Sequence, residues 1–245
     1  IERKTGGERA ASVAVGRFQP APDGIGPGFV HRENPFDDFK NQPLLPGKMS
    51  SFGPSMSWGD ANADGRPDVH FGGAVGQAGE LWINEGEGAF RSVAVPVLQE
   101  DAVCEDSDSI WFDADGDGDL DLLVASGSTE FAERDYRLLN RLYVNQGVGE
   151  DGRTPRFTRA PDAALAGLSF STGTIAAADF DADGDVDLFL GSRSVPGRYP
   201  VTPASHLLLN EGRDGGIRFV DGTDAVASGL GRAGLVTGAE WADFD

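Results

Sequence analysis

Hydrophobic residues in this chain form short runs, separated by stretches rich in Gly, Pro, Asp and Asn. Short branched or aromatic runs bounded by such residues are typical of β-strands. The strands predicted in this way are 13–18, 29–31, 109–112, 120–125, 142–145 and one that opens at Phe157. Helical periodicity is confined to a turn or two at 129–135, 160–165 and 224–227. The pattern therefore predicts an all-β chain.

One apolar signature, Leu-x-x-Asn-x-Gly followed by a Phe, begins at Leu81, Leu142 and Leu207. It predicts a strand, an Asn-x-Gly turn and a second strand. Together with an acidic loop it recurs every 53 to 66 residues, which is room for four short antiparallel strands. Four-stranded units repeated around an axis are the blades of a β-propeller. We predict a partial propeller of about four blades with calcium loops between strands, and its main insertions at 129–141 and 193–205.

The acidic loops carry the pattern D-x-[DN]-x-D-G-x-x-D and begin at Asp60, Asp113 and Asp179, with a fourth starting at Asp243. We name them the first to fourth acidic loops. Alternate carboxylates before a glycine are typical of a chain that curls around Ca²⁺, which takes roughly six to eight oxygen ligands. Positions 1, 3, 5 and 9 are expected to supply side chains, and position 7 its backbone carbonyl. The predicted metal-site residues are Asp60, Asn62, Asp64, Arg66, Asp68, Asp113, Asp115, Asp117, Asp119, Asp121, Asp179, Asp181, Asp183, Asp185, Asp187, Asp243 and Asp245.

These loops begin like an EF-hand but end differently. An EF-hand needs a Glu at position 12 and flanking helices, whereas position 12 of the second loop is Val124, inside a predicted strand. In the first loop Asn62 and Arg66 stand where the other loops have acids, so we expect it to bind calcium most weakly. The alternative is that the acids only hold Asp-Gly turns through their own hydrogen bonds; three copies in register favour the metal.

Composition narrows the functional classes. The chain has 245 residues and a formal net charge of −20, which disfavours a nucleic-acid partner because phosphate binding needs a basic face. No apolar run approaches the roughly 20 residues of a membrane helix. Cys104 is the only cysteine, so an intrachain disulfide is impossible.

The repeated motifs make the chain similar to FG-GAP/VCBS repeat proteins, such as the propellers of integrin α-subunits. Three segments, Glu105-Asp106, 191–200 and 234–241, further resemble the bacterial ASPIC/UnbV group related to cartilage acidic protein. The resemblance covers residues 29–245 and leaves 1–28 as a partial blade or an irregular segment. It implies an extracellular calcium-binding propeller. Because such propellers usually have about seven blades, we expect this chain to be part of a longer protein, truncated in its last repeat.

We predict a non-enzymatic module, secreted or at the cell surface, in which calcium makes the loops rigid and the insertions bind a protein or glycan. One alternative is a polysaccharide-active enzyme, lyase-like, or its accessory domain; another is a structural spacer in a larger secreted protein. A lyase-like site would draw on Arg193, Arg198, Tyr199 and His206, which lie in one insertion. The G-x-G-x-x-G match at 229–234 lacks the strand and helix of a dinucleotide site, and Cys104 has no cationic neighbour in sequence to activate it.

Overall fold

The computed structural model describes residues 26–212 and 215–243, which form three sheets of four antiparallel strands each. Within each sheet the strands follow one another in chain order, so every sheet is a meander. The first sheet contains β1 (Met56–Gly59), β2 (Asp68–Phe71), β3 (Glu80–Gly86) and β4 (Ala89–Val93). The second contains β5 (Asp106–Phe112), β6 (Asp121–Ser126), β7 (Arg141–Val148) and β8 (Pro155–Arg159). The third contains β9 (Thr172–Ala178), β10 (Asp187–Ser192), β11 (His206–Asn210) and β12 (Phe219–Asp221).

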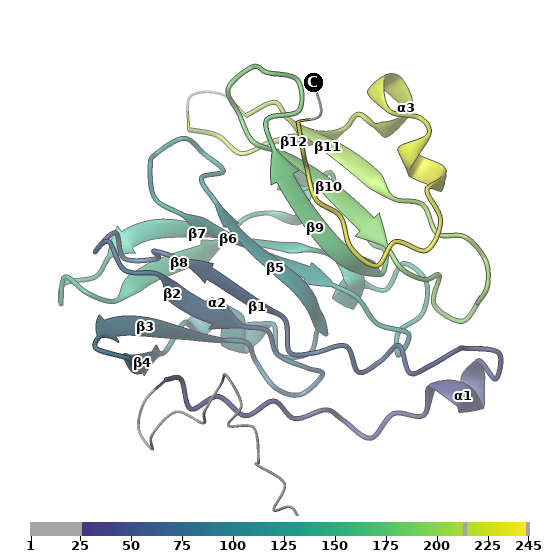
Figure 1. Ribbon diagram of the computed structural model, residues 1–245, viewed down its shortest axis with the longest axis horizontal. Helices are drawn as coiled ribbons and strands as arrows, with labels where there is room; N and C mark the ends of the chain where they lie inside the picture. Colours follow the sequence, from purple (N-terminus) through teal and green to yellow (C-terminus); the bar gives the residue numbers. More distant parts are fainter. Residues whose placement is uncertain (1–25, 213–214, 244–245) are drawn as a thin grey trace, which may run out of the picture.

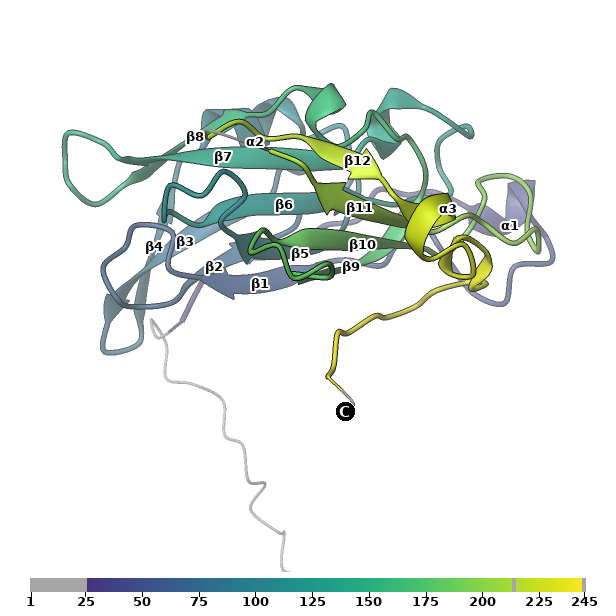
Figure 2. The same cartoon turned by 90° about the horizontal axis from the view of Figure 1, so that it is seen from above.

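The sheets lie side by side as propeller blades do (Figure 1). The first strand of each sheet lies innermost, and β5 contacts both β1 and β9. Figure 2 shows the same succession of sheets from above, with α3 beyond the end of β11. The all-β, partial-propeller prediction is confirmed, and the described chain is an open array of blades without ring closure.

Alternating side chains of the middle blade build two separate cores. Leu122 and Val124 pack towards the first sheet, whereas Leu123 and Ala125 pack towards the third. All six residues of β6 are buried, because a strand covered on both faces needs apolar side chains on both. The continuous apolar run that predicted this strand is therefore the sequence signal of an internal blade.

Helices in the described residues are short and lie between strands. They are α1 (Asp38–Asn41), α2 (Pro96–Glu100), η1 (Tyr136–Leu138), η2 (Asp162–Ala164), α3 (Thr223–Val226) and η3 (Leu230–Arg232). The helical turns predicted near 160–165 and 224–227 are confirmed. The turn predicted at 129–135 is wrong: the helix η1 starts after Asp135, whose carboxylate caps it by accepting from Arg137 N.

The strand predicted at 29–31 is also wrong. This segment is extended, but it is held by side chains instead of a ladder: the Phe29 ring stacks on Phe71 at 4.8 Å, and Gln77 Nε2 donates to Val30 O. The strand predicted at 13–18 lies outside the described residues. Residues 26–31 thus run against the outer face of the first sheet.

The segment before the fourth acidic loop occupies the place of a further inner strand. Val236 stands seven residues before Asp243, as Asp106 stands seven before Asp113. Val236 N donates to Ser192 O at 3.0 Å, and Asp106 N makes the equivalent bond to Gly73 O at 3.3 Å. Val236 thus holds the same register against the third sheet as Asp106 holds against the first.

Among residues 26–212 and 215–243, no helix has the length and apolar character needed to cross a bilayer.

Candidate functional site

The three complete acidic loops lie at one end of the blades, each joining the first strand of its sheet to the second. In every loop the position 1 carboxylate folds back over the turn; for example, Asp113 accepts from Gly116 N at 2.8 Å and from Gly118 N at 3.0 Å. The glycine at position 6 has a positive φ of 85°, 93° or 100°, a conformation that other residues resist. Position 4 is left-handed as well, at Ala63, Gly116 and Ala182.

The acids at positions 1, 3 and 5 converge. One carboxylate oxygen from each of Asp113, Asp115 and Asp117 lies within 4.8 Å of the other two, and Asp179, Asp181 and Asp183 form the same cluster. Three hard oxygen donors at this spacing fit a divalent cation such as Ca²⁺. These residues would hold the ion, and its positive charge would offset the repulsion between their carboxylates.

The acid at position 9 lies at the base of the loop, where it binds two backbone N–H groups. Asp121 accepts from Ala114 N at 2.8 Å and from Asn145 N at 2.7 Å, and is 1% exposed. The same pair of bonds is made by Asp68 to Ala61 and Asn84, and by Asp187 to Phe180 and Asn210. Position 9 therefore clamps its loop to the third strand of the blade.

Burial and neighbouring charges raise the pKa values of several acids in the loops. Burial raises the pKa of Asp121 to about 7 and that of Asp68 to about 6, although the N–H bonds oppose the change. The pKa of Asp115 is raised by partial burial and by the neighbouring charges of Asp117 and Asp113. Because a cation among these carboxylates would favour their charged forms, metal binding and proton release are expected to be linked.

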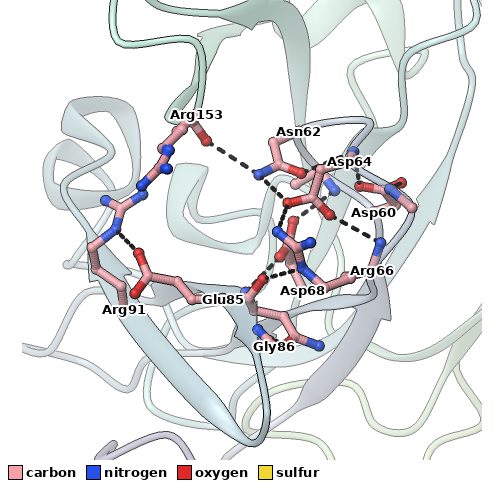
Figure 3. A network of polar contacts seen from close by, with 12 residues as sticks. Asp60, Asn62, Asp64, Arg66, Asp68, Glu85, Gly86, Arg91 and Arg153 are labelled. Carbon is pink, nitrogen blue, oxygen red and sulfur yellow. Dashed lines mark hydrogen bonds and ion pairs between the residues drawn. The ribbon is translucent and has the colours of Figure 1, made fainter.

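The first loop differs in its charges (Figure 3). Arg66 Nη2 forms an ion pair of 2.5 Å with Asp64, and its Nε donates to Asn84 O. Asn62 Nδ2 donates to Asp64 and to Arg153 O, which lies in the β7–β8 hairpin of the next blade. Asp64 therefore already has a positive partner and an amide donor, which supports the prediction that this loop binds calcium most weakly.

The remaining predicted residues have distinct places. At position 7, the N–H groups of Asp119 and Asp185 donate to the position 5 carboxylates at 2.9 and 3.0 Å. Asp243 lies at the end of the described chain, near Trp241, whose ring contacts Phe180 at 5.6 Å. Asp245 lies outside the described residues.

The asparagine of the Leu-x-x-Asn-x-Gly signature has a role that the sequence analysis missed. Asn145 Nδ2 donates to Ala61 O at 2.9 Å, in the loop of the preceding blade, and to Leu120 O at 3.1 Å. Asn210 Nδ2 likewise donates to Ala114 O at 3.4 Å. The recurrence of this residue beside each loop was the available signal, but the partner blade is invisible in the sequence.

The four residues considered for a lyase-like site do not form one cluster. The Arg193 guanidinium lies over the Phe52 ring at 4.1 Å, Arg198 pairs with Glu133, and Tyr199 N donates to Gln42. His206 Nδ1 lies 2.8 Å from Asp221 Oδ2. Each of these four residues contacts a different partner, as expected of side chains that pack the insertion loops.

Other candidate residues are structural. Cys104 is buried, and burial raises the pKa of its thiol, so an inert thiol is expected. Glu105 and Asp106, which carry part of the ASPIC/UnbV resemblance, bind Val75 N and Gly73 N of the first blade. The closer resemblance to that group stays a prediction.

Comparison with known proteins agrees with the repeat pattern. A family model described as an FG-GAP-like repeat matches residues 60–124 and again residues 113–190. Each match begins at the first acid of one loop and ends in the strand that follows the next loop. A comparison with curated proteins gave no match.

Proposed function

The chain belongs to the FG-GAP-like repeat family, and from this premise we propose that it is a calcium-binding propeller module that acts outside the cell and binds a protein or a glycan. Family membership favours a binding role over catalysis. The observation that carries the calcium role is the convergence of acids at positions 1, 3 and 5 in two successive loops.

The physical role of the ion follows from the position of the loops. Each loop connects the innermost strand of a blade to its neighbour, and its position 9 acid binds the third strand. An ion at positions 1, 3 and 5 would neutralise the clustered carboxylates and make the turn rigid. Extracellular calcium modules bind at about 10⁻⁴–10⁻³ M, an affinity suited to the concentration outside cells. If these loops bind calcium in that range, they would be filled outside the cell and empty in a calcium-poor cytosol, which ties the proposed location to the measured affinity.

The test is a calorimetric calcium titration of the chelator-treated chain and of two matched variants. Asp115→Asn removes one charge from the second loop but keeps an oxygen that can accept the Asp117 N bond; we expect it to lose one site. Glu100→Gln removes an exposed acid at the end of α2 and should leave all sites intact. Absence of binding heat, with the same thermal melt in calcium and in chelator, would refute the calcium role and leave the loops as hydrogen-bonded Asp-Gly turns.

The affinity order is a second test. Arg66→Ala frees Asp64 from its ion pair, so we expect the weakest site to bind calcium more tightly in this variant. An unchanged weakest site would show that Arg66 does not compete with the ion.

A further inference from the structure

The two insertions predicted from the sequence meet at a pocket of about 530 Å³, at the opposite end of the blades from the acidic loops. Its wall includes residues just before β9, at the end of β10 and at the start of β11, whereas the third loop joins the other ends of β9 and β10. Arg198 of one insertion pairs with Glu133 of the other at 3.3 Å, which ties the two together. We name this cavity the insertion pocket.

Two serine side chains in its wall place hydroxyl groups at the cavity. Ser171 and Ser194 both line the pocket, and each is 4% exposed. Neighbouring serines are satisfied: Ser192 Oγ donates to Ser171 O at 2.8 Å, and Ser169 Oγ donates to Asp135 O at 2.6 Å. A serine hydroxyl can both donate and accept, so the two side chains offer both kinds of hydrogen bond to a ligand in the pocket.

The lining also offers an aromatic surface and an oriented imidazole. The Phe170 and His206 rings pack at 4.7 Å, and both line the pocket. His206 Nδ1 faces the Asp221 carboxylate, which also accepts from Thr223. A carboxylate at Nδ1 favours the tautomer in which Nε2 is an acceptor, so Nε2 is left to accept from a ligand hydroxyl.

The charge of the pocket selects the class of ligand. Its charged lining residues are Glu133 and Arg134, one of each sign, with Glu133 already paired. A chain with a net charge of −20 repels polyanions. Hydroxyl donors and acceptors beside an aromatic face, with no excess charge, suit a neutral polyhydroxylated ring. A few placed polar groups in a concave apolar site are typical of small-ligand pockets of this volume.

We propose that the insertion pocket binds a neutral saccharide unit, with the Ser171 and Ser194 hydroxyls and His206 Nε2 as its hydrogen-bonding partners and Phe170 as its apolar contact. This inference rests on the proposed binding function and gives it a site and a ligand class. It uses none of the acidic-loop residues, so the two proposals can fail separately.

The test uses the whole chain and saturation-transfer NMR with glucose, galactose, mannose, fucose and N-acetylglucosamine as probes. We expect transfer from at least one sugar, and a loss of affinity of about tenfold or more when Ser171→Ala and Ser194→Ala are combined. The matched control, Ser92→Ala, removes an exposed hydroxyl from β4 and should bind as the parent does. Since the double variant removes only two oxygen atoms, its thermal melt should stay close to that of the parent.

Three outcomes overturn the inference: no transfer from any of these sugars, equal transfer in the double variant and the control, or preferential binding of glucuronate. Calcium titration separates the two proposals. Sugar binding that persists in Asp115→Asn supports the pocket whatever the calcium result. Calcium binding without sugar binding refutes the pocket and leaves the calcium role standing.

Discussion

Replacing Asn145 by alanine tests whether neighbouring blades are joined through the acidic loops. Asn145 is 2% exposed. It donates to Ala61 O and Leu120 O and accepts from Gly147 N at 3.1 Å. The matched control is Asn84, the equivalent residue of the first blade, which has no preceding blade among the described residues. Within residues 26–212 and 215–243, its side chain donates only to Pro67 O and accepts from Gly86 N.

The two variants should differ in the free energy of unfolding. Asn84→Ala removes two partly exposed hydrogen bonds and should cost about 1 kcal/mol. Asn145→Ala removes three bonds and deprives the Ala61 and Leu120 carbonyls of this donor, so it should cost roughly 3 kcal/mol. The difference measures the connection between blades together with the deeper burial of Asn145.

Urea unfolding of both variants in chelator, followed by tryptophan fluorescence and circular dichroism, gives the comparison. Coincident transitions with the two probes establish that one cooperative step is measured. A cost for Asn145→Ala no greater than that for Asn84→Ala would refute the connection between blades. Equal slopes against urea would show that the change lies in stability and not in the compactness of either state.

Three further predictions concern the packing of the blades. Burial, reinforced by the Glu33 charge, raises the pKa of Glu105 to about 9, so the folded state keeps a proton that the unfolded state loses above its ordinary pKa of 4.5. Stability should therefore fall as pH rises from about 4.5 to about 9, and Glu105→Gln should reduce the loss between about pH 5 and pH 8 by about 4 kcal/mol; an identical pH profile in chemical denaturation would contradict this. A Cβ on Gly127 would lie 1.9 Å from Thr172 O, so Gly127→Ala should lower the free energy of unfolding in urea by more than about 2 kcal/mol. The control is Gly47→Ala, whose Cβ meets open space and which should lower it by about 0.5 kcal/mol or less. Cys104 is 4% exposed, so a thiol reagent should modify it quickly in urea and slowly in buffer; fast labelling of the folded chain would show that it is accessible.

The strands and loops of this fold could be predicted because they depend on local patterns. The run at 120–125 alternates between two cores, so its continuous apolar character marked an internal strand. The D-x-D-x-D-G pattern marked the loops, because the turn needs a glycine with positive φ at position 6. Both signals lie within a few residues of the structure that they specify.

Features that depend on distant segments could not be predicted. The loop pattern predicts Asp121 as a metal ligand, but its bonds to Ala114 N and Asn145 N depend on the third strand lying beside the loop, which no local pattern specifies. The insertion pocket joins side chains from residues 133 to 206, and no local pattern links them. The segment at 29–31 is apolar like a strand, but its Phe29 packs on the first sheet without the segment pairing with a strand of that sheet. The sequence does not distinguish these two arrangements.

The bonds made by Asn145 connect the first and second acidic loops through one residue. Asp121 of the second loop holds Asn145 N, and the Asn145 amide holds Ala61 O of the first loop. A ligand that orders the second loop therefore also orders the residue that restrains the first loop. Because coupling free energies are reciprocal, any effect that a ligand in the second loop has on the affinity of the first must be matched by an equal effect of a ligand in the first loop on the affinity of the second. The shared asparagine makes neighbouring loops the pairs in which such coupling should be measured.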